Sequence, residues 1–374
     1  MRIGLNLLFL KPGKVGGTQT YSENLVNALA TIGSEHEFFL FLNLECKNIF
    51  KNLPKNFKSI ICKIPGNIRP LRILYEQIVL PVKIRSNNID ILHSLGQTTP
   101  LISFCPSVIT MHDTNYWSCA SHFSLYERIL PRIFIRQSLF SAKHIIAVSH
   151  FTCEELIKKL NIKNEKITVV YEASNKFIKN KKEEEKNLLE KYGIRNSFLL
   201  SVASPWKHKN IAGLISIYNE LLQLGDAPKL VIVGHSVEKK PEIRQELQKL
   251  QKPENVIFTG YIEQSHLHIF YKNAFVFVFP SLYEGFGLPI LEAMTYGVPV
   301  VSSNAASLPE VAGDAALLAD PREQVGFAKQ IRRILDNKQL RDELSRRGIE
   351  RSSKFSWEKC ARETISVYKK VLQK

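Results

Sequence analysis

The stretch Ser281-Leu-Tyr-Glu-Gly-Phe-Gly-Leu-Pro-Ile-Leu-Glu292 follows closely on the apolar run Phe275-Val-Phe-Val-Phe279. The apolar run predicts a buried strand, and the two glycines predict a turn that a ligand can approach closely. Pro289 is favoured at the first position of a helix, where its missing N–H would have had no partner. We therefore predict a helix that starts near Leu288–Pro289 and ends before Gly297.

Two glutamates flank this predicted helix start. Glu284 lies in the turn and Glu292 lies in the helix, so the two are not neighbours on one helical face. The backbone N–H groups of Phe286, Gly287 and Leu288 lie between them and can hold an anion at the positive end of the helix. Carboxylates on either side can bind hydroxyls, so the pattern predicts a site for a nucleoside diphosphate sugar. Surface glutamates on an ordinary strand–loop–helix unit are the alternative; the proline, the glycines and both acids together argue against it.

The rest of the chain alternates predicted strands and helices in two series. The first series of strands is predicted at Arg2–Leu8, Glu37–Leu42, Ile60–Ile64, Ile89–His93, Val108–Met111, His144–Val148 and Ile167–Val170. The second is predicted at Ser197–Ala203, Lys229–Val233, Val256–Phe258 and Phe275–Phe279. Such alternation builds parallel sheets covered by helices on both faces.

The predicted fold class is therefore α/β, with two Rossmann-like, doubly wound domains. We place the first domain at residues 1–175, a charged connector at 176–196 and the second domain at 197–355. A length of 374 residues suits two domains of about 150–200 residues each. The six cysteines show no short paired spacing, so neither a zinc site nor a disulfide framework is predicted.

The net charge of +16 indicates an anionic partner or a well-solvated basic surface. Nucleic acid is not expected, because no recognition-module signature occurs. Leu71–Arg85 and Ser124–Lys143 predict helices that mix apolar residues with arginine and can lie on an anionic membrane surface. In the second, Arg128, Arg132 and Arg136 recur every four residues and share one face. A core-packed helix with a solvated basic stripe is the alternative.

The apolar run within Met1–Leu10 is too short for a secretion signal and fits a first strand better. No run approaches the ~20 apolar residues of a membrane span. We expect a cytoplasmic protein, with peripheral contact to the inner face of the membrane as an open alternative.

The two glutamates, with Gly-Phe-Gly-Leu-Pro between them and Glu-Ala-Met-x-x-Gly-x-Pro-Val-Val after, resemble the donor-binding signature of family 4 retaining glycosyltransferases. Residues 302–316 are similar to the continuation in bacterial members that build O-antigen and capsule chains, often with mannose or rhamnose. The resemblance covers essentially the whole chain and is most specific over residues 256–320. It implies the GT-B architecture of two Rossmann-like domains facing across a cleft, with a last helix at 356–374 packing toward the first domain.

The resemblance also assigns roles to residues outside the stretch. Gly16 and Gly17 match the family's Gly-Gly loop beside the donor phosphates, and His112 matches a histidine expected to bond a sugar hydroxyl. Lys209 matches a lysine that neutralises the donor diphosphate. The arginine that many relatives carry five residues earlier is Ser204 here, so the full phosphate clamp is not implied.

Lys207 or His208 could supply the missing positive group. The Gly-x-Gly-x-x-Gly pattern of a nicotinamide dehydrogenase does not occur. Neither an Asp-x-Asp motif nor a metal-ligand cluster occurs in the sequence, so we expect transfer without a metal or other cofactor. The predicted catalytic residues are Lys209, Glu284 and His112. The predicted donor-binding residues are Gly16, Gly17, Lys209, Glu284, Phe286, Gly287, Leu288 and Glu292.

The expected function is transfer of a hexose, mannose first, from a nucleotide sugar to a glycan or lipid-linked acceptor in cell-surface polysaccharide synthesis. GDP-mannose is the first expected donor, followed by dTDP-rhamnose and UDP-sugars. Two alternatives remain at this stage: a nucleotide-sugar epimerase or phosphorylase of the same fold, and a non-catalytic nucleotide-sugar-binding subunit. A nucleic-acid binder is a remote third.

Overall fold

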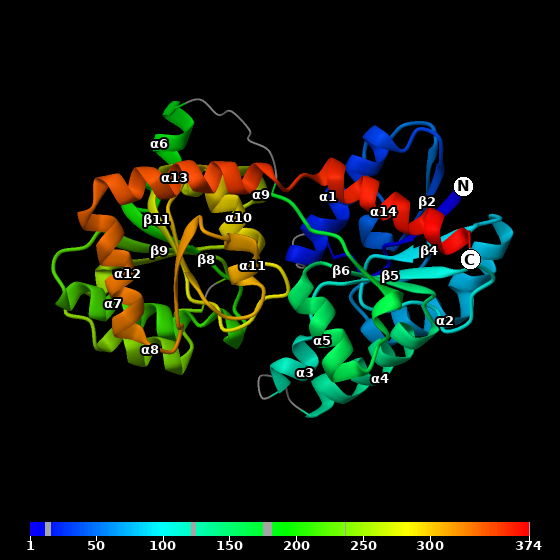
Figure 1. The fold of residues 1–374 in the computed structure, drawn as a ribbon, viewed down its shortest axis with the longest axis horizontal. Coiled ribbons are helices and arrows are strands. Elements are labelled where there is room, and N and C mark those ends of the chain that lie inside the picture. Colours follow the sequence, from blue (N-terminus) through cyan, green and yellow to red (C-terminus); the bar gives the residue numbers. More distant parts are fainter. Residues whose placement is uncertain (12–15, 121–124, 175–181, 236, 374) are drawn as a thin grey trace. The chain divides into compact units, whose positions relative to one another are not determined.

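The computed structural model describes residues 1–11, 16–120, 125–174, 182–235 and 237–373, and it divides into two compact units (Figure 1). The first unit comprises Met1–Glu172 and Phe355–Lys374, and the second comprises Ala173–Lys354. Residues 12–15 of the predicted glycine loop, residue 175 and residues 176–181 of the predicted connector lie outside the described residues.

The first unit contains a seven-stranded parallel sheet in the order β3-β2-β1-β4-β5-β6-β7. Its strands are β1 (Arg2–Asn6), β2 (Glu37–Leu42), β3 (Phe57–Ile61), β4 (Ile91–Ser94), β5 (Ser107–Met111), β6 (His144–Ala147) and β7 (Ile167–Val169). Its helices are α1 (Gly17–Ile32), α2 (Arg69–Ser86), α3 (Asn115–Ser118), α4 (Leu125–Ser141), α5 (His150–Leu160) and α14 (Trp357–Leu372). Helices α1 and α14 cover one face of this sheet, and α2, α4 and α5 cover the other (Figure 1).

The second unit contains a six-stranded parallel sheet in the order β10-β9-β8-β11-β12-β13. Its strands are β8 (Phe198–Val202), β9 (Lys229–Val233), β10 (Val256–Gly260), β11 (Ala274–Phe279), β12 (Val300–Ser303) and β13 (Ala316–Ala319). Its helices are α6 (Lys182–Lys191), α7 (Ile211–Gln223), α8 (Pro241–Gln248), α9 (Gln264–Asn273), α10 (Leu288–Thr295), α11 (Leu308–Ala312), α12 (Gln324–Asp336) and α13 (Lys338–Ser353).

Each sheet reverses its winding direction once. In the second unit the chain winds outward from β8 to β10 and then, from β11 to β13, in the opposite direction. The reversal lies between β8 and β11, which are hydrogen-bonded neighbours. Loops that follow the two strands at such a reversal diverge, and ligands of doubly wound sheets bind there. The apolar run that predicted β11 is buried from Val276 to Phe279 at this central position, with Phe277 and Val278 both at 0% exposure.

Strands β12 and β13 and helices α3, α6 and α11 were not predicted from the sequence. Strands β12 and β13 have only four residues each, and the Ala-Leu-Leu-Ala of β13 has no strand preference of its own, so pairing with β12 decides its conformation. Helix α6 occupies part of the predicted connector. Its first turn carries Glu183, Glu184 and Glu185, which favour a helix N-terminus, and Glu185 forms an ion pair with Lys272 at 2.7 Å.

A buried hydrogen-bond chain joins α14 to the sheet of the first unit. The Tyr368 hydroxyl lies 2.6 Å from Nδ1 of His93, whose Nε2 lies 2.8 Å from the Thr110 hydroxyl. The Tyr21 hydroxyl of α1 lies 3.1 Å from the same Thr110 oxygen. Burial, and then the charge of His112, lowers the pKa of His93 to about 3, so this imidazole is neutral. The last helix is therefore held to the first sheet by polar contacts as well as by apolar packing.

All six cysteines have free thiols, and five of them are buried. In the described part of the chain, none of the helices has the length and apolar character that crossing a bilayer requires.

Replacing Tyr368 with Phe removes the hydroxyl and leaves one nitrogen of buried His93 without its partner. We predict a loss of about 1–3 kcal/mol in the free energy of unfolding, measured by urea denaturation. Tyr261→Phe is the control, because Tyr261 is 55% exposed and its loss of a hydroxyl is expected to be neutral. Equal stability of Tyr368→Phe and the wild type would contradict the proposed role of this hydrogen-bond chain.

Candidate functional site

Two loops of the second unit follow the strands at its reversal point. Lys209 ends a short 3-10 turn, Lys207–Lys209, after β8, and Glu284 lies in the turn between β11 and α10. Lys209 and Glu284, which were predicted from separate parts of the sequence, therefore lie after the carboxyl ends of neighbouring strands. This is the edge at which a parallel sheet presents ligand-binding side chains.

Lys209 and Glu284 form a close ion pair. The Lys209 Nζ donates to both oxygens of the Glu284 carboxylate, at 2.6 and 2.8 Å, and both side chains are largely buried. The same ammonium lies 5.6 Å from the centre of the Phe279 ring, at the end of β11. A partly desolvated cation held by one carboxylate and one aromatic face is suited to exchange its partner for a phosphate.

Hydrogen bonds to backbone carbonyls hold the two loops together. The carbonyl of His208 accepts from the backbone N–H of Leu282 at 2.7 Å and from the Ser281 hydroxyl at 3.0 Å. The Asn210 amide donates to the carbonyls of Pro280 and Pro321 at 3.1 and 3.2 Å. Lys209 is thus positioned by contacts on both sides of it.

Ser307 holds the turn that carries Glu284. This fully buried hydroxyl lies 2.9 Å from the carbonyl oxygen of Glu284 and 2.7 Å from that of Phe286. The following residue, Gly287, has φ of +111°, and a Cβ there would lie 2.6 Å from Leu308. Glycine is therefore required at this position both by backbone conformation and by space.

Helix α10 begins at Leu288, with Pro289 in its first turn, as predicted. Its cap residue, Gly287, has no side chain to bond the first N–H groups of the helix. The side chains of Phe286 and Leu288 are buried, so their contact with a ligand would run through the backbone. The positive end of α10 therefore lies directly after the Glu284 turn.

Glu292 has a different partner from Glu284. Its carboxylate accepts a hydrogen bond of 2.7 Å from the hydroxyl of Tyr271 on α9. Burial raises the pKa of Glu292 to about 7, although the Tyr271 bond opposes this shift. Near neutral pH the carboxyl group is thus close to half ionised. The sequence did not identify Tyr271 as part of the site, because nothing in its spacing marks which helix packs against α10.

In the first unit, His112 follows β5 and is almost fully buried. Its Nε2–H donates to the carbonyl of Leu95 at 2.9 Å, and its Nδ1 lies 3.1 Å from the Glu172 carboxylate. Burial lowers the pKa of His112, but the hydrogen bond and charge of Glu172 outweigh this effect and leave the pKa raised. Both ring nitrogens have protein partners, so the predicted bond to a sugar hydroxyl requires the exchange of one of them.

Gly16 and Gly17 are exposed at the start of α1, after β1. No side chain caps this helix start, and a Cβ at Gly16 would meet no atom within 4 Å. Tyr21, in the next turn of α1, packs edge-on against the His112 ring with centroids 4.8 Å apart. The structure therefore brings the glycine pair and His112 to the same edge of the first sheet.

Ser204 stands where the resemblance leads us to expect an arginine. Ser204 is half-buried after β8, the side chain of Lys207 is exposed, and that of His208 is buried. Lys240 approaches the same loop, with its Nζ donating to the carbonyl of Pro205 at 2.6 Å. Lys207 is thus the more available of the two predicted substitutes.

The sequence matches two family models in succession. Residues 15–173 match the model described as Glycosyltransferase Family 4, and residues 181–351 match that described as Glycosyl transferases group 1. The chain is 34% identical over 267 residues to the O-antigen chain mannosyltransferase B of Escherichia coli, covering 70% of each chain. The chain belongs to the family 4 glycosyltransferases.

A second relative of this glycosyltransferase is the O-antigen chain mannosyltransferase RfbU of Salmonella typhimurium, 29% identical over 72% of this chain and 70% of that protein. Similar solved structures include a sucrose-phosphate synthase from Thermosynechococcus elongatus, with a TM-score of 0.79, 20% identity and coverage of 100% and 99%. Anabaena HepE in complex with UDP-glucose gives a TM-score of 0.72, 19% identity and coverage of 99% and 100%. The predicted GT-B fold class is confirmed.

The raised pKa of Glu292 predicts a pH-dependent stability. Between the ordinary pKa of 4.5 and about 7, the folded protein holds a proton that the unfolded chain has released, so this residue's stabilising contribution falls as pH rises through that window. Glu292→Gln is expected to remove this dependence. Relative to the variant, the wild type should lose roughly 3 kcal/mol of unfolding free energy between pH 4.5 and pH 8, measured by urea denaturation.

Glu254→Gln is the control, because Glu254 is exposed on the surface of the same unit. A parallel pH profile for the wild type and Glu292→Gln would show that the carboxyl group is ordinarily ionised.

Proposed function

We propose that this glycosyltransferase moves a hexose from a nucleoside diphosphate sugar to a glycan or lipid-linked acceptor, with retention of configuration and without a metal or other cofactor. The observation that carries the proposal is the Lys209–Glu284 ion pair beside the start of α10. In this proposal the lysine is the cation for a diphosphate and the glutamate is the carboxylate for sugar hydroxyls, and one hydrogen bond separates the two.

Mannose is the proposed sugar and cell-surface polysaccharide the proposed product. Support comes from the relatives named as O-antigen chain mannosyltransferases in Escherichia coli and Salmonella typhimurium. GDP-mannose is accordingly the first proposed donor, followed by dTDP-rhamnose and UDP-sugars.

In the proposed reaction the bond between the sugar C1 and the donor phosphate oxygen breaks, and a bond from C1 to the acceptor oxygen forms. The acceptor hydroxyl proton passes to the departing phosphate on the same face of the sugar. Negative charge grows on the diphosphate as the C1–oxygen bond lengthens. Lys209 and the N-terminal N–H groups of α10 are arranged to stabilise that charge.

The two glutamates take separate roles in the proposal. Glu284, released from Lys209, accepts hydrogen bonds from the hexose hydroxyls, and Glu292 accepts them from the ribose diol. Glu292 must be ionised to act only as an acceptor, so donor binding drives off its proton. The hydroxyl of Tyr271 then keeps the carboxylate oriented toward the ribose.

The first unit supplies the acceptor side in this proposal. Its glycine pair at the start of α1 offers backbone N–H groups for phosphate, and the His112–Glu172 pair sets the charge at the carboxyl edge of its sheet. The hydrogen bond from His112 to a sugar hydroxyl stays a prediction.

Lys209→Ala removes the charge that meets the diphosphate. We predict weaker binding of GDP-mannose by calorimetry and a fall of roughly 10²-fold or more in the transfer rate, the scale typical of a lost charge-stabilising group. Lys229→Ala is the matched control, because Lys229 is an exposed lysine at the amino end of β9, the opposite edge of the sheet.

An unchanged transfer rate in Lys209→Ala would contradict the proposed site. Change of the donor sugar in the absence of any acceptor would instead indicate an epimerase, and dependence on free phosphate would indicate a phosphorylase. Binding of the donor without turnover under all conditions would indicate a binding subunit.

We further propose that the first unit contacts an anionic membrane surface through α2 and α4. Helix α2 exposes Leu71, Leu74, Ile78 and Val82, spaced so that they share one face, at 43–62% exposure. Helix α4, on the same side of the sheet, exposes Ile129, Leu130, Ile133 and Phe140. Apolar side chains in such a continuous stripe favour burial in a bilayer interface.

Arginines accompany these apolar side chains. Arg85 lies over the ring of exposed Phe104, and Arg136 over that of exposed Phe140, at 4.8 and 5.8 Å from the ring centres. Each guanidinium can remain at the level of anionic headgroups while the ring enters the interface. Arg132 does not join the other arginines of α4 in this role, because its Nε donates a hydrogen bond to the carbonyl of Tyr116.

The membrane proposal is tested by sedimentation with vesicles of phosphatidylglycerol and phosphatidylcholine at low and high salt. Wild-type protein should bind the anionic vesicles and dissociate as salt screens the charges. The double variant Ile78→Asp and Val82→Asp should bind at least about tenfold more weakly, because two charged side chains oppose insertion. Val325→Asp, at an exposed position on α12, is the control. Equal binding of all three proteins would exclude this face.

A further inference from the structure

A two-part groove lies at the amino ends of β5 and β6 in the first unit. Ser107 begins β5, and Lys143 directly precedes β6; the Lys143 backbone N–H donates to the Ser107 carbonyl at 2.8 Å. His112 and the glycine pair lie at the carboxyl edge of this sheet, so the groove is at the opposite edge. It is therefore separate from the proposed donor and acceptor residues.

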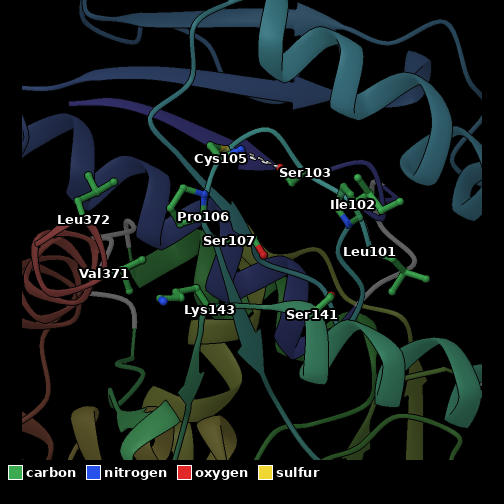
Figure 2. A pocket seen from close by; sticks show the side chains of 11 residues that line it. Leu101, Ile102, Ser103, Cys105, Pro106, Ser107, Ser141, Lys143, Val371 and Leu372 are labelled. Atoms are coloured by element: carbon green, nitrogen blue, oxygen red, sulfur yellow. Dashed lines mark hydrogen bonds between the residues drawn. The ribbon is translucent and has the colours of Figure 1, made fainter. Parts of the chain in front are cut away.

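The first compartment has a volume of about 590 Å³ and is lined by apolar side chains, three serines and Lys143. Leu101 and Ile102 of the β4–β5 loop form one side, and Val371 and Leu372 at the end of α14 form the other (Figure 2). Ile102 is 79% exposed, so most of its apolar surface is accessible to a ligand. This volume falls within the range of about 300–1,000 Å³ that is typical of small-molecule sites.

The second compartment also has a volume of about 590 Å³ and is cationic. Lys143, Lys163, Lys166 and Lys370 line it, with Glu165 as its one acid. Lys143, Ser141 and Val371 line both compartments, which are therefore continuous. Burial and the nearby charge of Lys143 lower the pKa of Lys166, so these two ammonium groups repel each other.

We propose that this groove binds an anionic phospholipid, with its phosphate among Lys143, Lys166 and Lys370 and its first acyl segments between Ile102 and Leu372. A phosphate relieves the repulsion between the lysines, and an acyl chain covers apolar surface that water otherwise contacts. Neither a free phosphate nor a neutral lipid satisfies both compartments.

The bilayer is the source that the structure favours. The loop that carries Leu101 and Ile102 is tied to α2, because the Leu101 N–H donates a hydrogen bond of 2.9 Å to Gln77 Oε1 and Phe104 lies under Arg85. The rim of the groove is thus continuous with the face proposed to contact membrane. The inference draws on that membrane contact only for access, and it does not depend on the sugar-transfer reaction.

Calorimetric titration of the full chain with short-chain lipids below their micelle concentration tests the site apart from vesicle binding. Dihexanoyl-phosphatidylglycerol should bind, and dihexanoyl-phosphatidylcholine and inorganic phosphate should each bind roughly tenfold more weakly or worse, since each satisfies only part of the groove. Lys143→Ala should reduce binding of the anionic lipid to the level of the neutral one. Ile102→Ser should weaken both lipids and leave phosphate unchanged.

Lys329→Ala, an exposed lysine of α12 in the second unit, is the charge-matched control and should behave as the wild type. Equal affinity for phosphate and for the anionic lipid, with no effect of Ile102→Ser, would overturn the lipid assignment in favour of a free-anion site. No lipid binding, or binding unaffected by Lys143→Ala, would overturn the proposal. Transfer activity is not the readout, so failure here is distinct from failure of the sugar-transfer proposal.

Discussion

The ion pair between Lys209 and Glu284 is the interaction on which the account of this enzyme depends. Burying two opposite charges costs solvation, and the pair is stable only because each partner is held in place by its own loop. The Ser281 hydroxyl and the Leu282 backbone N–H donate to the His208 carbonyl and fix the lysine loop, and the Ser307 hydroxyl fixes the glutamate turn. The same rigidity places a cation and a carboxylate side by side before any ligand arrives, which is the condition for efficient charge stabilisation.

Topology explains why these residues meet although 75 positions separate them. Strands β8 and β11 are neighbours at the point where the second sheet reverses direction, so the loops after them start side by side. The first sheet has the same arrangement, with its reversal between β1 and β4. The glycine pair follows β1 and His112 follows β5, at the matching edge. Both units thus contain a parallel sheet with one winding reversal, and each sheet carries a different set of polar groups at its carboxyl edge.

Much of this could be predicted from sequence because the signals are local. Five apolar residues mark β11, Pro289 and Gly287 mark the start of α10, and the predicted bounds of β2 and β9 agree with the structure. Strands β12 and β13 were missed because pairing, not composition, makes them strands. The partners of the site residues were also beyond reach: Tyr271, Ser307 and Glu172 carry no signal that links them to Glu292, Glu284 and His112. Such contacts depend on which helix packs against which strand, and a single sequence does not encode that in any short spacing.

In the proposed complex the donor diphosphate replaces Glu284 as the partner of Lys209, and the sugar hydroxyls replace Lys209 as the partner of Glu284. A crystal structure of the enzyme with GDP-mannose tests this most directly. We expect that Lys209 Nζ bonds a diphosphate oxygen, that the Glu284 carboxylate accepts from mannose hydroxyls, and that both direct Lys209–Glu284 bonds of 2.6 and 2.8 Å lengthen or break. A bound donor whose diphosphate lies away from an unchanged Lys209–Glu284 pair would contradict it.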